Sequence, residues 1–238
     1  MAKITREKFK VFENVFDQHS YRNIYKLISE GYFDGVGSPV SIGKEANIFV
    51  GEFNDRRKPN IIKIYRLQTC NFNKMFEYIR ADARFANLKT QKRQIVFAWT
   101  QREYRNILKA REAGIKVPTP LVVKDNIIVM EFIGDEDPAP RLNVCSPDKK
   151  YLKSFFEKTI DFMQKLNKAG LVHADLSEFN ILNYNNSPVF IDFSQATISS
   201  HPHFKDFLKR DVYNVCRYFK KQGLKIDDEK VMKKIIQK

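Results

Sequence analysis

Cysteine is scarce in this chain, and its few cysteines form no pattern. Cys70, Cys145 and Cys216 are odd in number and widely spaced, so they build neither a disulfide framework nor a zinc-ligand motif. This usage is typical of a reducing compartment, and we expect a cytoplasmic protein. The chain also lacks an apolar run of about 18 residues and starts with a charged segment, so we expect no membrane span and no signal peptide.

Acidic residues are few beside the basic ones. Lys and Arg number 42 against 28 Asp and Glu, which gives a formal net charge of +14. An excess of this size indicates a polyanionic partner, most simply RNA, although a merely soluble basic surface would show it as well. Basic residues gather in 56–66, 84–111 and 205–225. No RNA-recognition signature with interleaved aromatic residues is present, so charge alone does not name the partner.

Internal repeats and low-complexity tracts are also absent. With 238 residues, of which 43% are hydrophobic, the chain is long enough for one large domain or two lobes with a real core. The pattern predicts an α+β fold with a helical extension at 1–38, a sheet-rich lobe at 39–133 and a linker with a helical lobe at 134–238.

The expected elements follow from hydrophobic period and turn signals. Ser20 is the expected N-cap of its helix. A basic, weakly patterned stretch at 68–94 is expected to be a mobile insert with some helix. In chain order the other expected elements are helices at 7–17 and 20–30, a strand pair within 40–53 turning at Gly43 and Lys44, a strand at 61–65, a helix at 99–113, a hairpin at 121–132 turning at Asp125 and Asn126, and helices at 148–169, 204–221 and the C-terminus.

The most informative feature is Leu171–Leu182 followed by Val189–Ser194. Asp175 and Asn180 have the D-x-x-x-x-N spacing of a kinase catalytic loop, and Asp192 adds a second carboxylate. Phosphoryl transfer needs a carboxylate facing the nucleophile and oxygen ligands for magnesium. A plain polar turn between two strands is the alternative, and the whole constellation argues against it.

A second pair of charged residues points to the same chemistry. Lys63 lies among aliphatic residues in a predicted strand, and Glu103 lies on the apolar stripe of a predicted helix, so each needs an opposite charge. A strand lysine paired with a helix glutamate positions nucleotide phosphates in kinases. The alternative is that the two side chains are unrelated and each extends toward solvent. The catalytic-loop motif favours the pair over this alternative.

Two further segments are candidates for nucleotide binding. Gly43 allows close backbone approach, and Ser41 and Lys44 flank it, although the segment is neither G-x-G-x-x-G nor a Walker A motif. Glu131 and Ile133 end an apolar strand before Gly134, at the place of a kinase hinge. There the Glu131 carbonyl and the Ile133 N–H would read the adenine edge.

Histidines near these motifs are expected to be structural. His173 is expected to bond the backbone of the catalytic loop, and His201 and His203 are interpreted as loop residues because no third ligand is near. Asp211, in the basic helix at 204–221, is a weaker candidate for bracing the catalytic loop.

The chain resembles the RIO family of atypical protein kinases, type-one branch, and its compact length is similar to archaeal members. The matching blocks are S-I-G-K-E-A-N-I-F (41–49), I-I-K-I-Y-R (61–66), W-T-Q-R-E-Y-R-N-I (99–107), L-V-H-A-D-L-S-E-F-N-I-L (171–182) and I-D-F-S-Q-A (191–196). Ile42 and Ile62 depart from the usual threonine and small residue, and neither change removes a catalytic group. Ser194 and the lack of an A-P-E segment argue against an activation-loop switch.

The resemblance implies a bilobal kinase fold without peptide-binding helices, use of ATP with Mg²⁺ or Mn²⁺, and serine autophosphorylation. It implies that Asp175 is the proton acceptor, that Asn180 and Asp192 hold the metal, and that Asp192 accepts phosphate as an aspartyl-phosphate. It also implies a role in small ribosomal subunit maturation, with the precursor particle and its rRNA as partners. The protein phosphoacceptor is not identified by the sequence.

Two other functions share these motifs. Small-molecule phosphotransferases of the aminoglycoside or choline kinase type usually carry a large helical acceptor domain after the metal aspartate, and only 46 residues follow Asp192 here. An ATP-gated RNA-binding scaffold shares every nucleotide residue with the kinase, so the sequence leaves it open.

Overall fold

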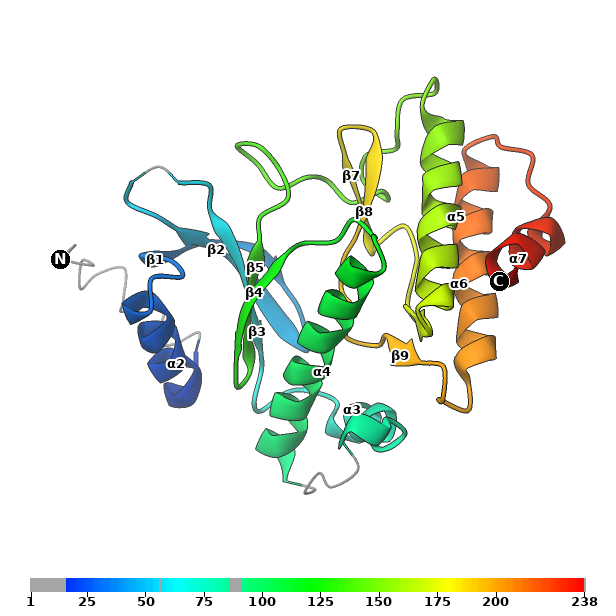
Figure 1. Ribbon diagram of the computed structural model, residues 1–238. Coiled ribbons are helices and arrows are strands. Elements are labelled where there is room, and N and C mark those ends of the chain that lie inside the picture. The colour runs from blue at the N-terminus through cyan, green and yellow to red at the C-terminus, as the bar shows by residue number, and fades with distance from the viewer. Residues whose placement is uncertain (1–15, 56, 86–90, 238) are drawn as a thin grey trace. The chain divides into compact units, whose positions relative to one another are not determined.

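The structure is a computed structural model that describes residues 16–55, 57–85 and 91–237 (Figure 1). The helix expected at 7–17 therefore lies almost wholly outside the described residues. The chain forms two compact units, each built from several segments. The first comprises 1–79, 87–101 and 120–132, and the second comprises 80–86, 102–119 and 133–238.

The first unit contains a five-stranded antiparallel sheet in the order β1-β2-β3-β5-β4. Its two hairpins turn where the sequence predicts, but β1 begins five residues before the expected strand, at Gly35. Asp125 takes the left-handed turn conformation between β4 and β5 with φ of 52°. The strands are β1 (Gly35–Ile42), β2 (Ala46–Glu52), β3 (Asn60–Tyr65), β4 (Pro120–Lys124) and β5 (Ile127–Glu131).

Helix α2 (Gln18–Ser29) packs its apolar stripe on one face of this sheet. Ile24 and Leu27 are buried with Ile62 and Ile64 of β3 in one core cluster. Asp17, not Ser20, is the N-cap, because its carboxylate accepts the N–H groups of residues 19 and 20 at 3.0 Å. Because side chains alternate along a strand, Lys63 points to the opposite face from Ile62 and Ile64.

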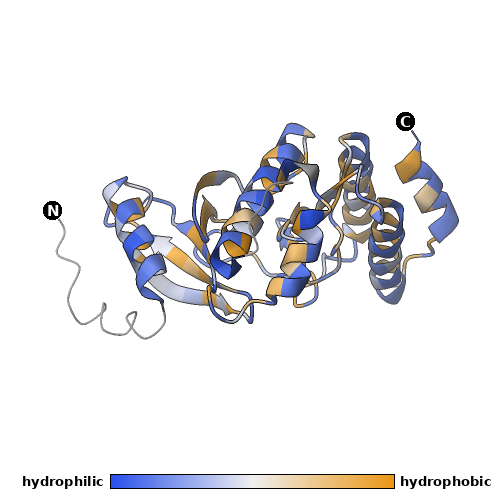
Figure 2. Cartoon of the chain, turned by 90° about the horizontal axis from the view of Figure 1, so that it is seen from below, coloured by the Kyte–Doolittle hydropathy of each residue, from blue (hydrophilic) through white to orange (hydrophobic). Residues whose placement is uncertain are grey.

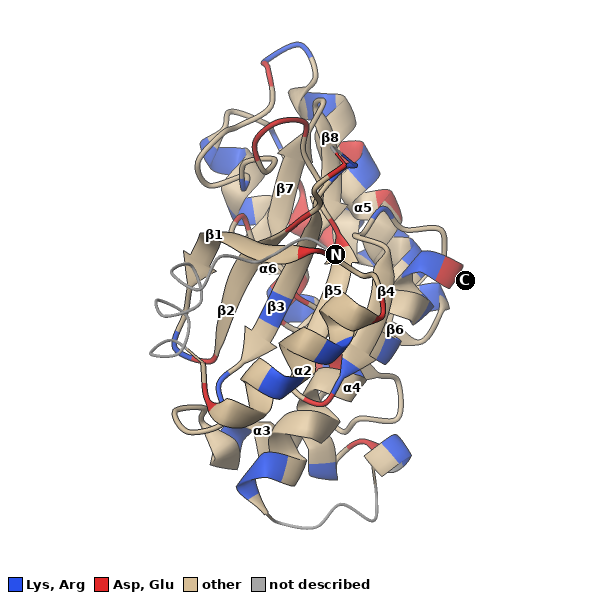
Figure 3. Cartoon of the chain, turned by 90° about the vertical axis from the view of Figure 1, so that its left-hand side faces the viewer, with Lys and Arg blue, Asp and Glu red and all other residues tan. Residues whose placement is uncertain are grey.

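The stretch between β3 and β4 is more helical than its pattern indicates. It forms α3 (Phe72–Arg80), a short 3₁₀ turn (Ala83–Phe85) and α4 (Lys92–Glu112), which starts seven residues before the expected position. The helical content expected in 68–94 is confirmed, and its mobility stays a prediction. Figure 3 shows Lys and Arg on α2 and α3, and α2 has no acidic residue in its first turn.

The second unit is mainly helical, with α5 (Leu152–Lys168), α6 (Phe204–Lys221) and α7 (Asp228–Ile236). Two small sheets lie between these helices in the sequence, pairing β6 (Leu171–Val172) with β9 (Thr197–Ile198), and β7 (Ile181–Tyr184) with β8 (Ser187–Phe190). The helices are amphipathic, as Figure 2 shows, and their apolar faces form one core cluster. Within the described ranges, no helix has the length and apolarity needed to cross a bilayer.

Candidate active site

Helix α6 holds the loop that follows β6. The carboxylate of Asp211 accepts the backbone N–H groups of Ala174 at 2.8 Å and Leu176 at 3.0 Å, while Asn214 donates to the Leu176 carbonyl at 3.3 Å. Arg210 donates to the Ala174 carbonyl. Ala174 has a left-handed φ of 63°, which is costly for a residue other than glycine and needs such support. The bracing role expected for Asp211 is confirmed.

Asp211 has an unusual environment for a carboxylate. It is only 1% exposed, and burial raises its pKa to about 7 from 3.8, against the opposing effect of the two backbone N–H bonds. The neighbouring Asp175 charge also raises this pKa, while Arg210 lowers it.

His173 bonds backbone, as expected, although the bond goes to the segment after β8, where a bond to its own loop was expected. Its Nε2 lies 3.0 Å from the Ile191 carbonyl, and its ring lies 4.7 Å from the Phe193 ring, centroid to centroid. It thereby joins the loop after β6 to the segment after β8. His201 and His203 lie in the turn before α6, in agreement with their interpretation as loop residues.

The β7–β8 hairpin brings Asn180 and Asp192 close together. Ile181 pairs with Phe190 at the base of the hairpin, so Asn180 lies one residue before the hairpin and Asp192 lies two residues after it. The Ile191 N–H donates to the Asn180 carbonyl at 3.0 Å. Asp192 has a left-handed φ of 61°, and its Oδ1 lies 3.4 Å from the Ser194 nitrogen. The sequence signal for this hairpin is the turn pair Asn185-Asn186 between two apolar runs.

Asp175 is held by two amide side chains. Asn180 Nδ2 lies 2.9 Å from the Asp175 backbone oxygen and 3.2 Å from its Oδ2, and Gln195 Nε2 lies 3.2 Å from the same Oδ2. The structure therefore brings Asp175, Asn180 and the segment 192–195 into one site. Gln195 was not predicted as a site residue, although it stands in the I-D-F-S-Q-A block.

Lys63 lies on the central strand of the first unit. It pairs with Ile48 of β2 and Ile128 of β5, is 6% exposed, and has its Nζ 5.1 Å from the centre of the Tyr65 ring. The enclosed environment expected for this lysine is confirmed. Glu103 is 1% exposed on α4 and belongs to the second unit, so its pairing with Lys63 stays a prediction.

The β1–β2 turn has a tightly defined backbone. A Cβ on Gly43 would lie 2.7 Å from the Ala46 carbonyl oxygen, and the Gly43 N–H bonds the same oxygen at 3.0 Å. The turn is tied to the chain after β3, because the Glu45 carbonyl accepts from the Arg66 N–H at 2.9 Å. Ser41 is half-buried at the end of β1, and Lys44 is exposed in the turn.

The hinge candidates lie where the first unit ends. Glu131 is the last residue of β5 and pairs with Asn60 of β3, while Ile133 is buried with Val189. The Ile133 carbonyl accepts the Ala139 N–H at 2.8 Å. Their contact with adenine stays a prediction.

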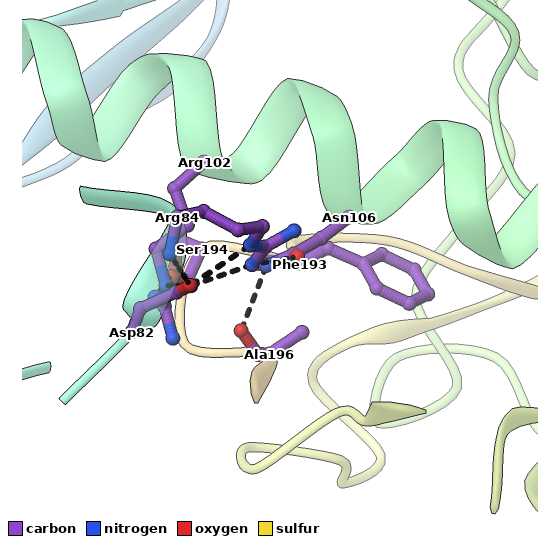
Figure 4. Close-up of polar contacts among 7 residues, drawn as sticks. All are labelled: Asp82, Arg84, Arg102, Asn106, Phe193, Ser194 and Ala196. Atoms are coloured by element: carbon purple, nitrogen blue, oxygen red, sulfur yellow. Dashed lines mark hydrogen bonds and ion pairs between the residues drawn. The ribbon is translucent and has the colours of Figure 1, made fainter. Parts of the chain in front are cut away.

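A buried polar cluster that the sequence did not predict lies beside the segment after Asp192. Figure 4 shows Arg102 and Asn106 of α4 pointing at the backbone of Phe193, Ser194 and Ala196, with Asp82 and Arg84 next to them. The signal was present in the sequence, because Arg102 and Asn106 share the buried stripe of α4 with Glu103. Polar residues on a buried stripe require partners.

Comparisons with known proteins agree with this geometry. A RIO domain model matches residues 47–232. The RIO-type serine/threonine-protein kinase Rio1 of Haloferax volcanii is 38% identical over 94% of this chain and 76% of its own length. Rio1 of Methanocaldococcus jannaschii is 37% identical, with 91% and 73% covered.

The fold is similar to that of solved Rio2 structures. The crystal structure of the Rio2 kinase from Chaetomium thermophilum matches with a TM-score of 0.67 at 23% identity, covering 89% of this chain and 66% of that one. A second structure, described as its ADP/Mg²⁺-phosphoaspartate complex, matches with a TM-score of 0.66 at 21% identity. The kinase-like fold expected from the sequence is confirmed, and the chain belongs to the RIO family of serine/threonine-protein kinases, which are phosphotransferases.

Proposed function

We propose that this kinase transfers the γ-phosphoryl group of ATP to serine or threonine hydroxyls with Mg²⁺, and that it acts in small ribosomal subunit maturation. The observation that carries the chemistry is the β7–β8 hairpin, which places Asn180 beside the segment that bears Asp192, with Asp175 bonded to Asn180. Each of the three groups matches a need of phosphoryl transfer.

The donor atoms fit a hard divalent cation. Asn180 uses its Nδ2 to bond Asp175, which directs its carbonyl oxygen elsewhere, and Asp192 supplies a carboxylate. Among the described residues, no group of three His, Cys, Asp or Glu side chains gathers around a point. A site with one carboxylate and one amide suits Mg²⁺ or Mn²⁺, which complete their shells with water and substrate phosphates. When bound, the ion would neutralise phosphate charge.

Asp175 is the proposed proton acceptor for the attacking hydroxyl. The amides of Asn180 and Gln195 fix its carboxylate by hydrogen bonds to Oδ2. A fixed carboxylate orients the nucleophile and takes its proton, and this contribution is typically about 10²- to 10⁴-fold in rate.

Asp192 is also the proposed phosphate acceptor on the enzyme. In this step the bond between the γ-phosphorus and the oxygen that bridges to ADP breaks, a new bond to a carboxylate oxygen of Asp192 forms, and ADP leaves. The phosphoaspartate in the Rio2 complex described above supports the proposal. Transfer to a hydroxyl or to water would then restore the carboxylate.

The residues proposed to bind the nucleotide are those that the sequence motifs indicate. The buried Lys63 and Glu103 would position the nucleotide phosphates. The turn at Gly43, with Ser41 and Lys44, would provide backbone and side-chain hydrogen-bond donors to them. The Glu131 carbonyl and the Ile133 N–H would form hydrogen bonds with the edge of the adenine.

The proposed partner is the precursor of the small ribosomal subunit and its rRNA. The net charge of +14 and the basic stretches at 84–111 and 205–225 support a polyanionic partner. An ATP-gated scaffold with little kinase activity is the second candidate, because it would use the same nucleotide residues.

The experiment that separates these functions is turnover of labelled ATP with and without purified precursor particles or a protein acceptor. We expect the wild type to label itself on serine and the particles to stimulate turnover. An Asp192→Asn variant that still turns over ATP would overturn the proposed chemistry. Particle binding with no phosphoryl transfer to any protein would favour the scaffold.

A further inference from the structure

Two side chains of α4 hold the backbone of the segment that follows Asp192. Arg102 Nη1 donates to the Ser194 carbonyl at 2.7 Å, and Asn106 Nδ2 donates to the carbonyls of Ala196 at 2.7 Å and Phe193 at 3.2 Å. Both side chains are completely buried. Bonds to three carbonyls within four residues leave this segment little freedom to move (Figure 4).

These two side chains are in turn held by the segment at 80–86. Asp82 is completely buried and accepts from Arg102 Nε at 3.1 Å and from Arg84 Nη2 at 2.6 Å. Arg84 Nη2 also donates to Asn106 Oδ1 at 2.9 Å, which fixes which end of the Asn106 amide faces the carbonyls. Burial opposes ionisation of Asp82, but the Arg84 hydrogen bonds keep its pKa below the ordinary value.

The segment 193–196 is linked to both the proposed metal ligand and the proposed proton acceptor. Asp192 immediately precedes it and has a left-handed backbone, a conformation that is unfavourable for a residue other than glycine and persists only when the surroundings enforce it. Gln195 lies within it and reaches Asp175 at 3.2 Å. A small movement of this segment would therefore displace the Asp192 carboxylate and release Asp175 at the same time.

We propose that Arg102 and Asn106, supported by Asp82, are positioning residues that set where Asp192 and Gln195 stand relative to the catalytic loop. The inference rests on the proposed function, because it takes Asp192 as a metal ligand. It adds that α4, which already carries Glu103, controls metal affinity through backbone carbonyls without touching the metal. Supporting groups of this kind typically change metal affinity or activity by roughly 10- to 100-fold when removed.

The test compares two asparagine variants in the full chain. Asn106→Ala removes the bonds to the carbonyls of 193 and 196. Asn167→Ala is the matched control, because Asn167 on α5 also donates from a helix to a backbone carbonyl, that of Ile235 at 3.1 Å, in the same unit. We would measure Mn²⁺ binding by electron paramagnetic resonance with ADP present, and thermal unfolding without ligands.

We expect Asn106→Ala to weaken Mn²⁺ binding by roughly 10-fold or more, and Asn167→Ala to leave it within twofold. Both variants should lower the melting temperature, Asn106→Ala more so because Asn106 is completely buried. Equal Mn²⁺ affinity in Asn106→Ala and wild type, or equal weakening in both variants, would overturn the inference. If Asn106→Ala does not fold, Arg102→Lys keeps the positive charge beside Asp82 and loses the bond geometry to Ser194, and the same weakening is expected of it. Unchanged affinity in Arg102→Lys would then overturn the inference.

Asp192→Asn separates this inference from the proposed function. If that variant loses Mn²⁺ binding while Asn106→Ala does not, only the positioning role fails. If Asp192→Asn binds Mn²⁺ with wild-type affinity, the proposed metal ligand is wrong and the positioning role fails with it.

Discussion

Asp211 offers the sharpest quantitative test of how the catalytic loop is held. Asp211→Ala removes the acceptor of two buried N–H groups, those of Ala174 at 2.8 Å and Leu176 at 3.0 Å. A buried donor left without a partner costs about 1–3 kcal/mol, so the two together predict a loss of about 2–6 kcal/mol in unfolding free energy. Urea denaturation at constant pH measures this loss.

The catalytic consequence of Asp211→Ala should exceed that of an equally destabilised variant. Ala174 adopts a left-handed backbone just before Asp175, and that conformation depends on the lost bonds. At a temperature where the variant is still folded, we expect its turnover at saturating ATP to be 10-fold or more lower than that of the wild type. A 10-fold decrease corresponds to a rise of about 1.4 kcal/mol in the activation free energy. A loss of stability below about 1 kcal/mol would refute the bracing argument.

The same residue predicts a pH dependence of stability. Because burial raises the pKa of folded Asp211 to about 7 from 3.8, the folded state binds this proton more tightly than the unfolded state. Its contribution to stability is therefore complete below about pH 4 and is lost as pH rises toward 7, by at most roughly 4 kcal/mol. Asp211→Asn removes the titration, so wild type and variant should differ in the slope of stability between pH 5 and 7. Parallel curves would contradict the raised pKa.

Four further predictions concern the proposed roles. Asp192→Asn should abolish phosphoryl transfer with little loss of fold, measured by labelled ATP and circular dichroism, and an active variant would remove its assignment. Asp175→Ala should lower turnover by about 10² or more while nucleotide still binds, since proton acceptance is lost, and a collapse of ATP affinity alone would contradict its role. Lys63→Ala should weaken transfer more than Glu103→Ala, and the reverse order in steady-state kinetics would count against the pair. Particle affinity should fall steeply with rising salt, because each phosphate contact releases counterion, and a flat salt titration would refute the electrostatic mechanism.

Local sequence predicted most elements of the fold because their signals are local. The β4–β5 hairpin follows from Asp125-Asn126 between apolar runs, and α6 has the predicted bounds, Phe204–Lys221. The start of α4 was placed seven residues late because residues 92–94 are basic or polar and 95–99 form an unbroken apolar run, which shows no helical period. The N-cap of α2 moved from Ser20 to Asp17, since either side chain can accept the N–H groups and only the helix start decides which one does.

The amino-acid sequence alone predicted the residues of the proposed site. The spacing of Asp175 and Asn180 and the block around Asp192 identify the family, and the aliphatic neighbours of Lys63 predict its enclosure. Such predictions are possible from sequence because the groups proposed for one loop are close in sequence and phosphoryl transfer requires particular residue types.

The contacts that hold those groups in place became visible only in the folded chain. Gln195 reaches Asp175 across 20 residues, Asp211 reaches Ala174 across 37, and Arg102 reaches Ser194 across 92. Packing determines these partners, because a polar group away from solvent bonds whichever donor or acceptor the fold brings within about 3 Å of it. The polar residues on the buried stripe of α4 indicate that hydrogen-bond partners exist, but only the folded structure identifies them.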